Sequence, residues 1–128
     1  MTIAATRSGK VDGVDLDGVL VFRGIPFAAP PVGPLRFMAP RREAPWDGVR
    51  DATRFAPDIA QADLPVARML GSDGSASDED GLYLNVWTPG CDDAHRSVMV
   101  WIHGGAYVFG SGAVSWYDGT HFARHGDV

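Results

Sequence analysis

The sequence predicts an α/β fold, and three observations lead to this expectation. The apolar stretch Val98–Ile102 ends in the pair Gly104-Gly105, which is typical of a strand covered on both faces of a sheet. Near the N-terminus, two short stretches flank Asp17-Gly18, a strong β-hairpin signal. Near the C-terminus, Gly119–His125 reads as a short helix. We find no internal repeat and no low-complexity tract.

Composition and charge limit the possible partners. The 128 residues suit one small domain or a piece of a larger one, and 45% apolar residues are enough for a core. With 16 acidic and 11 basic residues, the net charge of −5 disfavours nucleic acids and anionic membranes as partners. Residues 1–10 show no secretory signal, and the single cysteine, Cys91, cannot form an intrachain disulfide. We therefore expect a soluble, cytoplasmic protein.

The first elements in the chain are predicted to be a hairpin. Its strands are Lys10–Asp15 and Val19–Arg23, with the turn at Asp15–Gly18 between them. The three aspartates Asp12, Asp15 and Asp17 also suggest a calcium loop, but their spacing is wrong and no closing glutamate follows. Turn chemistry is the better interpretation.

A proline-rich segment, 24–37, follows the hairpin. Its four prolines argue against a regular helix and a central strand, yet its apolar residues predict an ordered loop that lies against a core. Arg36 stands between two apolar residues, so we expect a specific partner for its charge. Residues 45–52 predict a turn and a short strand, with Trp46 as a core or edge anchor.

The remaining elements alternate between strand, loop and helix. We expect a brief helix at 63–70, a loop at 71–78, and a strand over Leu82–Thr88 that Pro89-Gly90 stops. The aromatic loop at 107–116 either lines the entrance of a pocket or fills the core. The helix at Gly119–His125 should end with Gly126 at its C′ position.

The turn after Val98–Ile102 is the candidate functional site. It places successive backbone N–H groups at the end of a strand, where α/β sheets bind ligands and where a developing oxyanion can be held. A plain turn after a core strand remains the alternative. No serine lies in a G-x-S-x-G elbow, no dinucleotide or phosphate loop is present, and the histidines lack an H-E-x-x-H pattern. We therefore expect no cofactor and no metal site.

Three stretches, taken together, resemble the type-B carboxylesterases. They are Phe22–Phe37, Glu79–Pro89 and Trp101–Tyr107, and in this order they cover most of the chain. The resemblance implies an α/β-hydrolase fold and hydrolysis of carboxylic esters through an acyl-serine intermediate. It favours an oxyanion hole over a plain turn at the candidate site.

The resemblance also implies roles for individual residues. The oxyanion donors would be the backbone N–H groups of Gly105 and Ala106, with Gly104 shaping the turn. His103 would not be the catalytic base, and we expect it to pack at the end of the strand. Arg36 would form an ion pair with Glu79. Many family members carry a disulfide at the positions of Ala60 and Gly81, and neither cysteine is present here.

The resemblance further implies that residues 1–128 are an incomplete domain. The serine, acid and histidine of the triad would lie beyond Val128, in the order that this fold uses. We therefore expect an N-terminal segment of a single carboxylesterase domain, inactive alone, with the rest of the fold as its partner and an ester as the substrate. Without that rest, the strand at Val98 would leave an apolar edge open. A non-catalytic remnant, half of a split enzyme and a binding module of the same fold are the alternatives.

Overall fold

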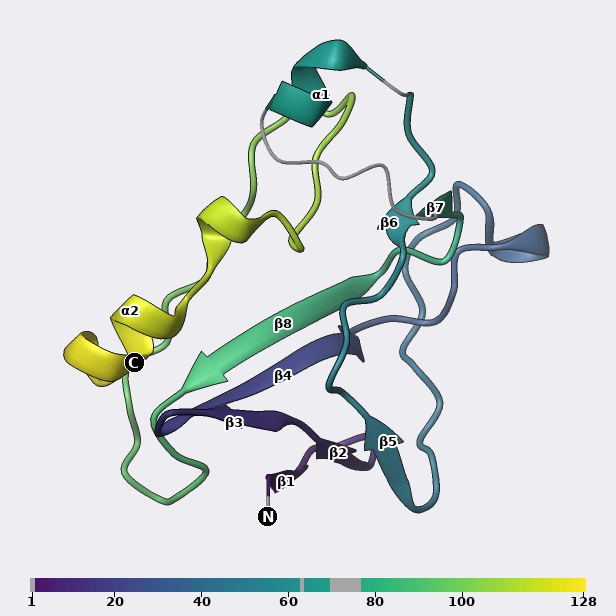
Figure 1. The fold of residues 1–128 in the computed structure, drawn as a ribbon. Coiled ribbons are helices and arrows are strands. Elements are labelled where there is room, and N and C mark those ends of the chain that lie inside the picture. Colours follow the sequence, from purple (N-terminus) through teal and green to yellow (C-terminus); the bar gives the residue numbers. More distant parts are fainter. Residues whose placement is uncertain (1, 63, 70–76) are drawn as a thin grey trace.

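The computed structural model describes residues 2–62, 64–69 and 77–128. Its two longest strands pair antiparallel to one another. Strand β4 (Val19–Pro26) pairs with β8 (Tyr83–Thr88) and with β3 (Val14–Leu16), giving the order β3-β4-β8. Figure 1 shows β4 and β8 crossing the middle of the view side by side, with the C-terminal helix at the left, near the arrowhead of β8. The strand predicted at Leu82–Thr88 is confirmed.

The predicted hairpin is confirmed at β3 and β4. Leu16 pairs with Val19, which leaves Asp17 and Gly18 as a two-residue turn with φ values of 52° and 85°. Positive φ at both central residues is the pattern of a type I′ turn, which matches the twist of the flanking strands. The Gly18 N–H donates to Asp15 Oδ1 at 2.8 Å, as turn chemistry predicts. Within the described ranges, no group of three or more metal-ligating side chains forms.

The first predicted strand, however, is split in two. Residues 10–15 divide at Gly13 into β2 (Lys10–Asp12) and β3, and the two parts pair with different strands. At the division the backbone approaches β4 so closely that a Cβ at Gly13 would lie 2.4 Å from the Val21 carbonyl oxygen. Strand β2 joins a second sheet of order β1-β2-β5, with β1 at Ile3–Ala5 and β5 at Val49–Asp51. Trp46 anchors this sheet by donating its indole N–H to the Lys10 carbonyl at 2.9 Å, as expected for an edge anchor.

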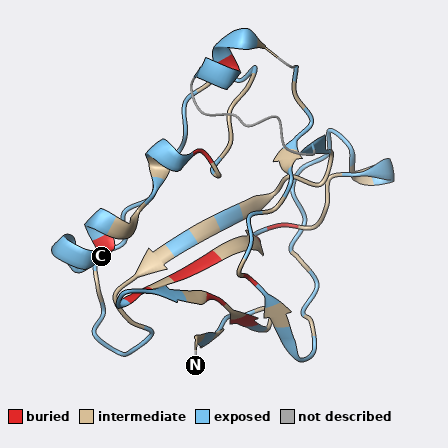
Figure 2. Cartoon of the chain, in the orientation of Figure 1, coloured by how far each residue is buried: buried red, intermediate tan, exposed pale blue. Residues whose placement is uncertain are grey.

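The core is small and lies on both faces of β4. On one face, Val19 and Val21 pack with Ala123 of helix α2 (Thr120–Gly126). On the other face, Phe22 packs with Val11 and Ala52 of the second sheet. Figure 2 shows these buried positions in red on and around β4. Strand β4 is therefore the element around which the described part of the chain is built.

Short elements complete the fold. They are η1 (Gly33–Leu35), β6 (Asp58–Ile59), α1 (Pro65–Met69), β7 (Ser77–Asp78) and η2 (Ser115–Tyr117). Helix α1 confirms the helix predicted at 63–70, although residues 63 and 70 lie outside the described residues. Of the loop predicted at 71–78, residues 71–76 lie outside the described residues, and residues 77–78 form β7. None of the described helices has the length and apolarity that crossing a membrane requires.

Two local predictions are wrong in detail. The proline segment does include strand, because β4 extends to Pro26, at the strand end where a missing N–H is tolerated. Its apolar loop packs only in part: Ala28 is buried, whereas Phe37 is 96% exposed. Helix α2 includes Gly126, and Asp127 instead takes the left-handed conformation at its end, with φ of 51°.

The strand predicted at Val98–Ile102 does not form. Its five side chains are between 50% and 87% exposed, and the segment has no assigned secondary structure. Figure 1 shows it as a green coil between the loop after β8 and the upper end of the molecule. A strand needs a neighbour for its backbone hydrogen bonds, and in the described part of the chain no strand pairs with this segment. The absence of neighbours, rather than the local sequence, explains the difference.

Candidate functional site

The candidate site is a tight turn at residues 104–110. The Gly105 carbonyl accepts from the N–H of Val108 at 2.9 Å and of Phe109 at 3.2 Å. Between them, Ala106 and Tyr107 both have positive φ, 53° and 61°. This is again the backbone pattern of a type I′ turn, but with side chains that disfavour it. Left-handed backbone costs about 1–2 kcal/mol for each such residue, so the surrounding contacts must hold the turn.

The glycines let the two limbs of the turn touch. A Cβ at Gly105, where φ is +136°, would lie 1.7 Å from the Phe109 carbonyl oxygen. A Cβ at Gly110, where φ is +115°, would lie 2.6 Å from the Gly104 carbonyl oxygen. At Gly104 nothing lies within 4 Å of the corresponding position. The turn is thus closed on its inner side and open at Gly104.

The predicted donors are available in this turn. Among the described residues, the backbone N–H groups of Gly105 and Ala106 find no hydrogen-bond acceptor. Gly105 is half-buried, and Gly104 and Ala106 are exposed. Two successive amides without an acceptor, on a turn held by its own contacts, can receive an oxygen that carries negative charge.

Two amide side chains from other segments hold the loop, and sequence reasoning missed both. Gln61 hydrogen-bonds to the backbone of Gly110 through both its oxygen, at 2.7 Å, and its nitrogen, at 3.1 Å. Asn85 of β8 donates to the Gly112 carbonyl at 3.2 Å and accepts from the Gly24 N–H at 3.0 Å. A signal for Asn85 was present, because it is an amide side chain within an apolar strand. Gln61 lies in a loop and carries no such signal.

The aromatic and histidine side chains near the turn are more exposed than expected. The His103 ring is exposed instead of packed, and its Nδ1 lies 2.8 Å from the Gly104 carbonyl oxygen. The rings of Trp101 and His103 both lie beside Tyr117, at centroid distances of 5.7 and 6.4 Å. Trp101 and His103 are two residues apart and face the same ring, which indicates that the backbone between them is extended although no strand pairs with it. Tyr107 is fully exposed, so it does not fill the core.

The ion pair predicted between Arg36 and Glu79 is confirmed. The Arg36 Nη2 and Glu79 Oε1 atoms are 2.6 Å apart, and the side chains are 57% and 43% exposed. At this exposure the pair contributes on the order of 1 kcal/mol or less, because water screens it. Nearby, a Cβ at Gly81 would lie 2.6 Å from Ile59 Cδ1, so Gly81 packs against the segment that contains Ala60.

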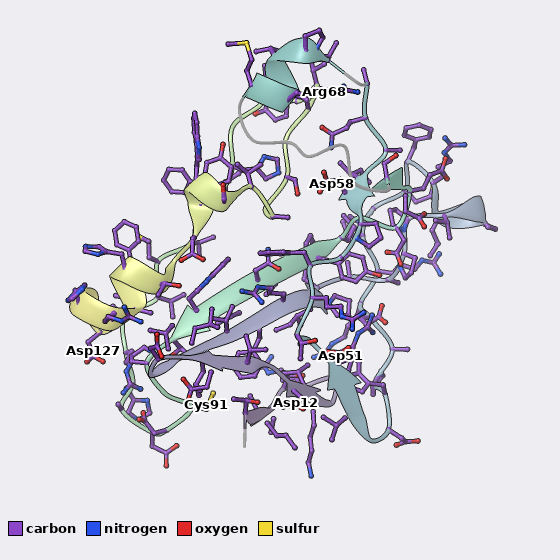
Figure 3. All side chains as sticks on the ribbon, viewed as in Figure 1. Asp12, Asp51, Asp58, Arg68, Cys91 and Asp127 are labelled. Atoms are coloured by element: carbon purple, nitrogen blue, oxygen red, sulfur yellow. The ribbon has the colours of Figure 1, made fainter. Side chains whose placement is uncertain are left out.

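Cys91 has no features of a nucleophile. Figure 3 labels it in the loop after β8, where its side chain is exposed. Loss of part of its hydration to neighbouring groups, and secondarily the adjacent Asp92, raise the pKa of its thiol, so the reactive thiolate is disfavoured. The same loop is tied to the end of α2 by Arg96, whose Nε donates to Asp127 at 2.6 Å. These contacts fit an incidental thiol in a structural loop.

Comparison with known proteins identifies the family. The sequence model of the carboxylesterase family matches residues 1–128. The chain belongs to the carboxylesterase family. It is 48% identical to phenmedipham hydrolase of Pseudarthrobacter oxydans over 128 residues, which cover 98% of this chain and 26% of that protein. It is 40% identical to para-nitrobenzyl esterase of Bacillus subtilis over 126 residues, with coverage of 98% and 26%.

Solved carboxylesterases share the same backbone. A Geobacillus stearothermophilus carboxylesterase matches all of this chain and 25% of its own, with 49% identity and a TM-score of 0.86. These structures have the α/β-hydrolase fold, so the resemblance to type-B carboxylesterases and the predicted fold class are confirmed. The chain spans about a quarter of the length of the relatives that it matches.

Proposed function

We propose that residues 1–128 form the N-terminal segment of a single serine carboxylesterase domain and supply its oxyanion hole. The family match supports this proposal, as do the activities that the names of the relatives state, para-nitrobenzyl esterase and phenmedipham hydrolase. The substrate class is a small carboxylic ester. The single cysteine cannot form an intrachain disulfide, which fits a reducing compartment, and we include a cytoplasmic location in the proposal.

The turn at 104–110 carries the chemical part of the proposal. When a serine attacks the ester carbonyl, the oxygen takes up negative charge, and the backbone N–H groups of Gly105 and Ala106 donate to it. The observation that supports this role is the pair of successive amides that have no acceptor among the described residues. Gly104 precedes the two donors and shapes the turn in this proposal.

The remaining catalytic groups belong to the rest of the domain in this proposal. The nucleophilic serine, the acid and the histidine follow in that order in α/β-hydrolases, and the chain contains no G-x-S-x-G elbow. An oxyanion hole without a nucleophile has no intermediate to stabilise, so residues 1–128 alone are inactive. The exposed apolar segment Val98–Ile102 fits the same proposal, because neighbouring strands of the complete sheet would cover it.

A comparison of two chains tests the proposal. Residues 1–128 and a full-length chain that contains them are assayed with p-nitrophenyl butyrate. We expect hydrolysis by the full-length chain and the buffer rate for residues 1–128. Hydrolysis by residues 1–128 would refute the division of the site. A folded but inactive full-length chain would refute the enzyme and leave a binding module as the better hypothesis.

A further inference from the structure

The side chain of Gln61 grips one residue of the turn by both of its backbone groups. The Gly110 N–H donates to Gln61 Oε1 at 2.7 Å, and Gln61 Nε2 donates to the Gly110 carbonyl at 3.1 Å. The same Nε2 also donates to the Ile59 carbonyl at 3.2 Å, which fixes the amide against its own segment. The two residues are 49 positions apart. The Gln61 amide thus satisfies both backbone groups of Gly110, as a paired strand would.

Gly110, which Gln61 holds, packs directly against the residues that precede the candidate donors. A Cβ at Gly110 would lie 2.6 Å from the Gly104 carbonyl oxygen and 2.8 Å from His103 Nδ1, so the returning limb packs against the entering one. One residue earlier, the Phe109 carbonyl oxygen lies over Gly105. A displacement of Gly110 therefore shifts the peptide groups that carry the candidate donors.

Within the described residues, no other distant segment holds the turn in this way. Among side chains in the described ranges, Gln61 is the one from a distant segment that hydrogen-bonds to the backbone of residues 104–110. The other side-chain contact to that backbone comes from His103, next to the turn in sequence. The left-handed residues Ala106 and Tyr107 raise the energy of the turn, and the hydrogen bonds from Gln61 add to the turn's own contacts in holding this conformation.

We propose that Gln61 is a positioning residue that holds the oxyanion turn in its donor geometry through Gly110. This inference rests on the proposed function. Gln61 contacts no substrate in this role, and it acts by keeping the Gly105 and Ala106 amides aimed at one point. Its removal lowers transition-state stabilisation while ground-state binding of the ester stays the same.

The test uses a full-length chain that contains residues 1–128. The variants Gln61→Leu and Gln61→Met keep a similar side-chain volume and remove both hydrogen bonds to Gly110. The control is Asp51→Ala, which removes two side-chain hydrogen bonds away from the turn, those from the N–H (2.9 Å) and hydroxyl (2.7 Å) of Thr53. Figure 3 labels Asp51 on β5, in the lower part of the view, whereas helix α1 lies at the top. In the hydrogen bonds that join distant segments of the described residues, the turn contacts Gln61 and not β5.

The readouts separate positioning from general stability. They are kcat per active site titrated with paraoxon, KM for p-nitrophenyl butyrate, and the inhibition constant of a trifluoromethyl ketone. This inhibitor forms a hemiketal oxyanion when the serine attacks it. For both Gln61 variants we expect kcat to fall about 10- to 100-fold, because a misplacement of about 1 Å costs up to that much. KM should stay within about threefold, and ketone affinity should fall in proportion to kcat.

Each possible outcome decides a distinct point. A kcat within about threefold of wild type in either Gln61 variant would overturn the positioning role. A loss of soluble protein in both variants, with Asp51→Ala soluble, would also overturn it, because the side chain would then serve folding. An inactive wild-type chain would overturn the proposed function itself, and the inference with it. The expected pattern in the Gln61 variants, with an unchanged control, would support the proposal.

Discussion

The substitution Gly105→Ala is the most direct test of the turn. Gly105 has φ of +136°, and a Cβ there would lie 1.7 Å from the Phe109 carbonyl oxygen. The two atoms would have to separate to at least 3.0 Å, the lower limit for real Cβ contacts. That shift must move the peptide between Gly105 and Ala106, because the added methyl group is rigidly attached to the backbone.

The expected effect follows from hydrogen-bond geometry. A donor that moves by about 1 Å from an optimal distance of about 2.9 Å no longer forms a useful hydrogen bond. Loss of one oxyanion donor lowers kcat by about 10²- to 10³-fold, which corresponds to about 3–4 kcal/mol of transition-state stabilisation. We therefore expect Gly105→Ala in a full-length chain to lose at least about 100-fold in kcat.

The assay and its control separate this effect from backbone strain. The assay is kcat per titrated active site with p-nitrophenyl butyrate. The control Gly48→Ala also places alanine at a positive φ, +75°, but nothing lies within 4 Å of the new Cβ. The control should lose about 1–2 kcal/mol of stability and keep its kcat, because strain alone does not reach the donors. A Gly105→Ala enzyme with wild-type kcat would refute the assignment of the donors.

Three further predictions concern stability and solubility. Arg36→Met should lower the free energy of unfolding by no more than about 1 kcal/mol, in a salt-dependent way, because the pair with Glu79 is half exposed; a larger loss in chemical denaturation would contradict the screened pair. Burial, and then the hydrogen bond to Asp80, raise the pKa of Tyr83 to about 12. Stability should therefore fall as pH rises from about 10 to about 12, because the unfolded chain loses this proton first. Absorbance at alkaline pH should show one tyrosine that ionises at a higher pH than the others, and Tyr83→Phe should abolish that step; titration of all three tyrosines near their ordinary pKa would argue against the shift. Val100→Lys should reduce aggregation of residues 1–128 in light scattering, because Val100 is 78% exposed in an apolar stretch; unchanged aggregation would show that another surface is responsible.

The hairpin and the strand β8 could be predicted from local sequence. The hairpin at Asp17-Gly18 follows from turn chemistry that operates over four residues, and the structure places Leu16 opposite Val19 as that chemistry requires. The strand at Leu82–Thr88 follows from its residue types and from the Pro89-Gly90 stop. The split at Gly13 could not be predicted, because it depends on the different strands with which β2 and β3 pair.

The candidate site divides in the same way. The turn itself was predicted from Gly104, Gly105 and the apolar run before them. Its clamp was not, because Gln61 is 49 residues from Gly110 and has no local pattern that marks it. The unpaired state of Val98–Ile102 also depends on tertiary context, because the same five residues form a strand only where neighbours supply backbone partners.

The sequence by itself determined the family, the hairpin, the Arg36–Glu79 pair and the position of the turn at Gly104-Gly105. These features depend on short-range turn chemistry or on motifs shared with the carboxylesterases. Only the tertiary structure decided that β4 is covered on both faces, that Ala106 and Tyr107 are held at positive φ, and that Gln61 closes the turn. The physical reason is that backbone strain and long-range hydrogen bonds depend on groups that the chain brings together only when it folds.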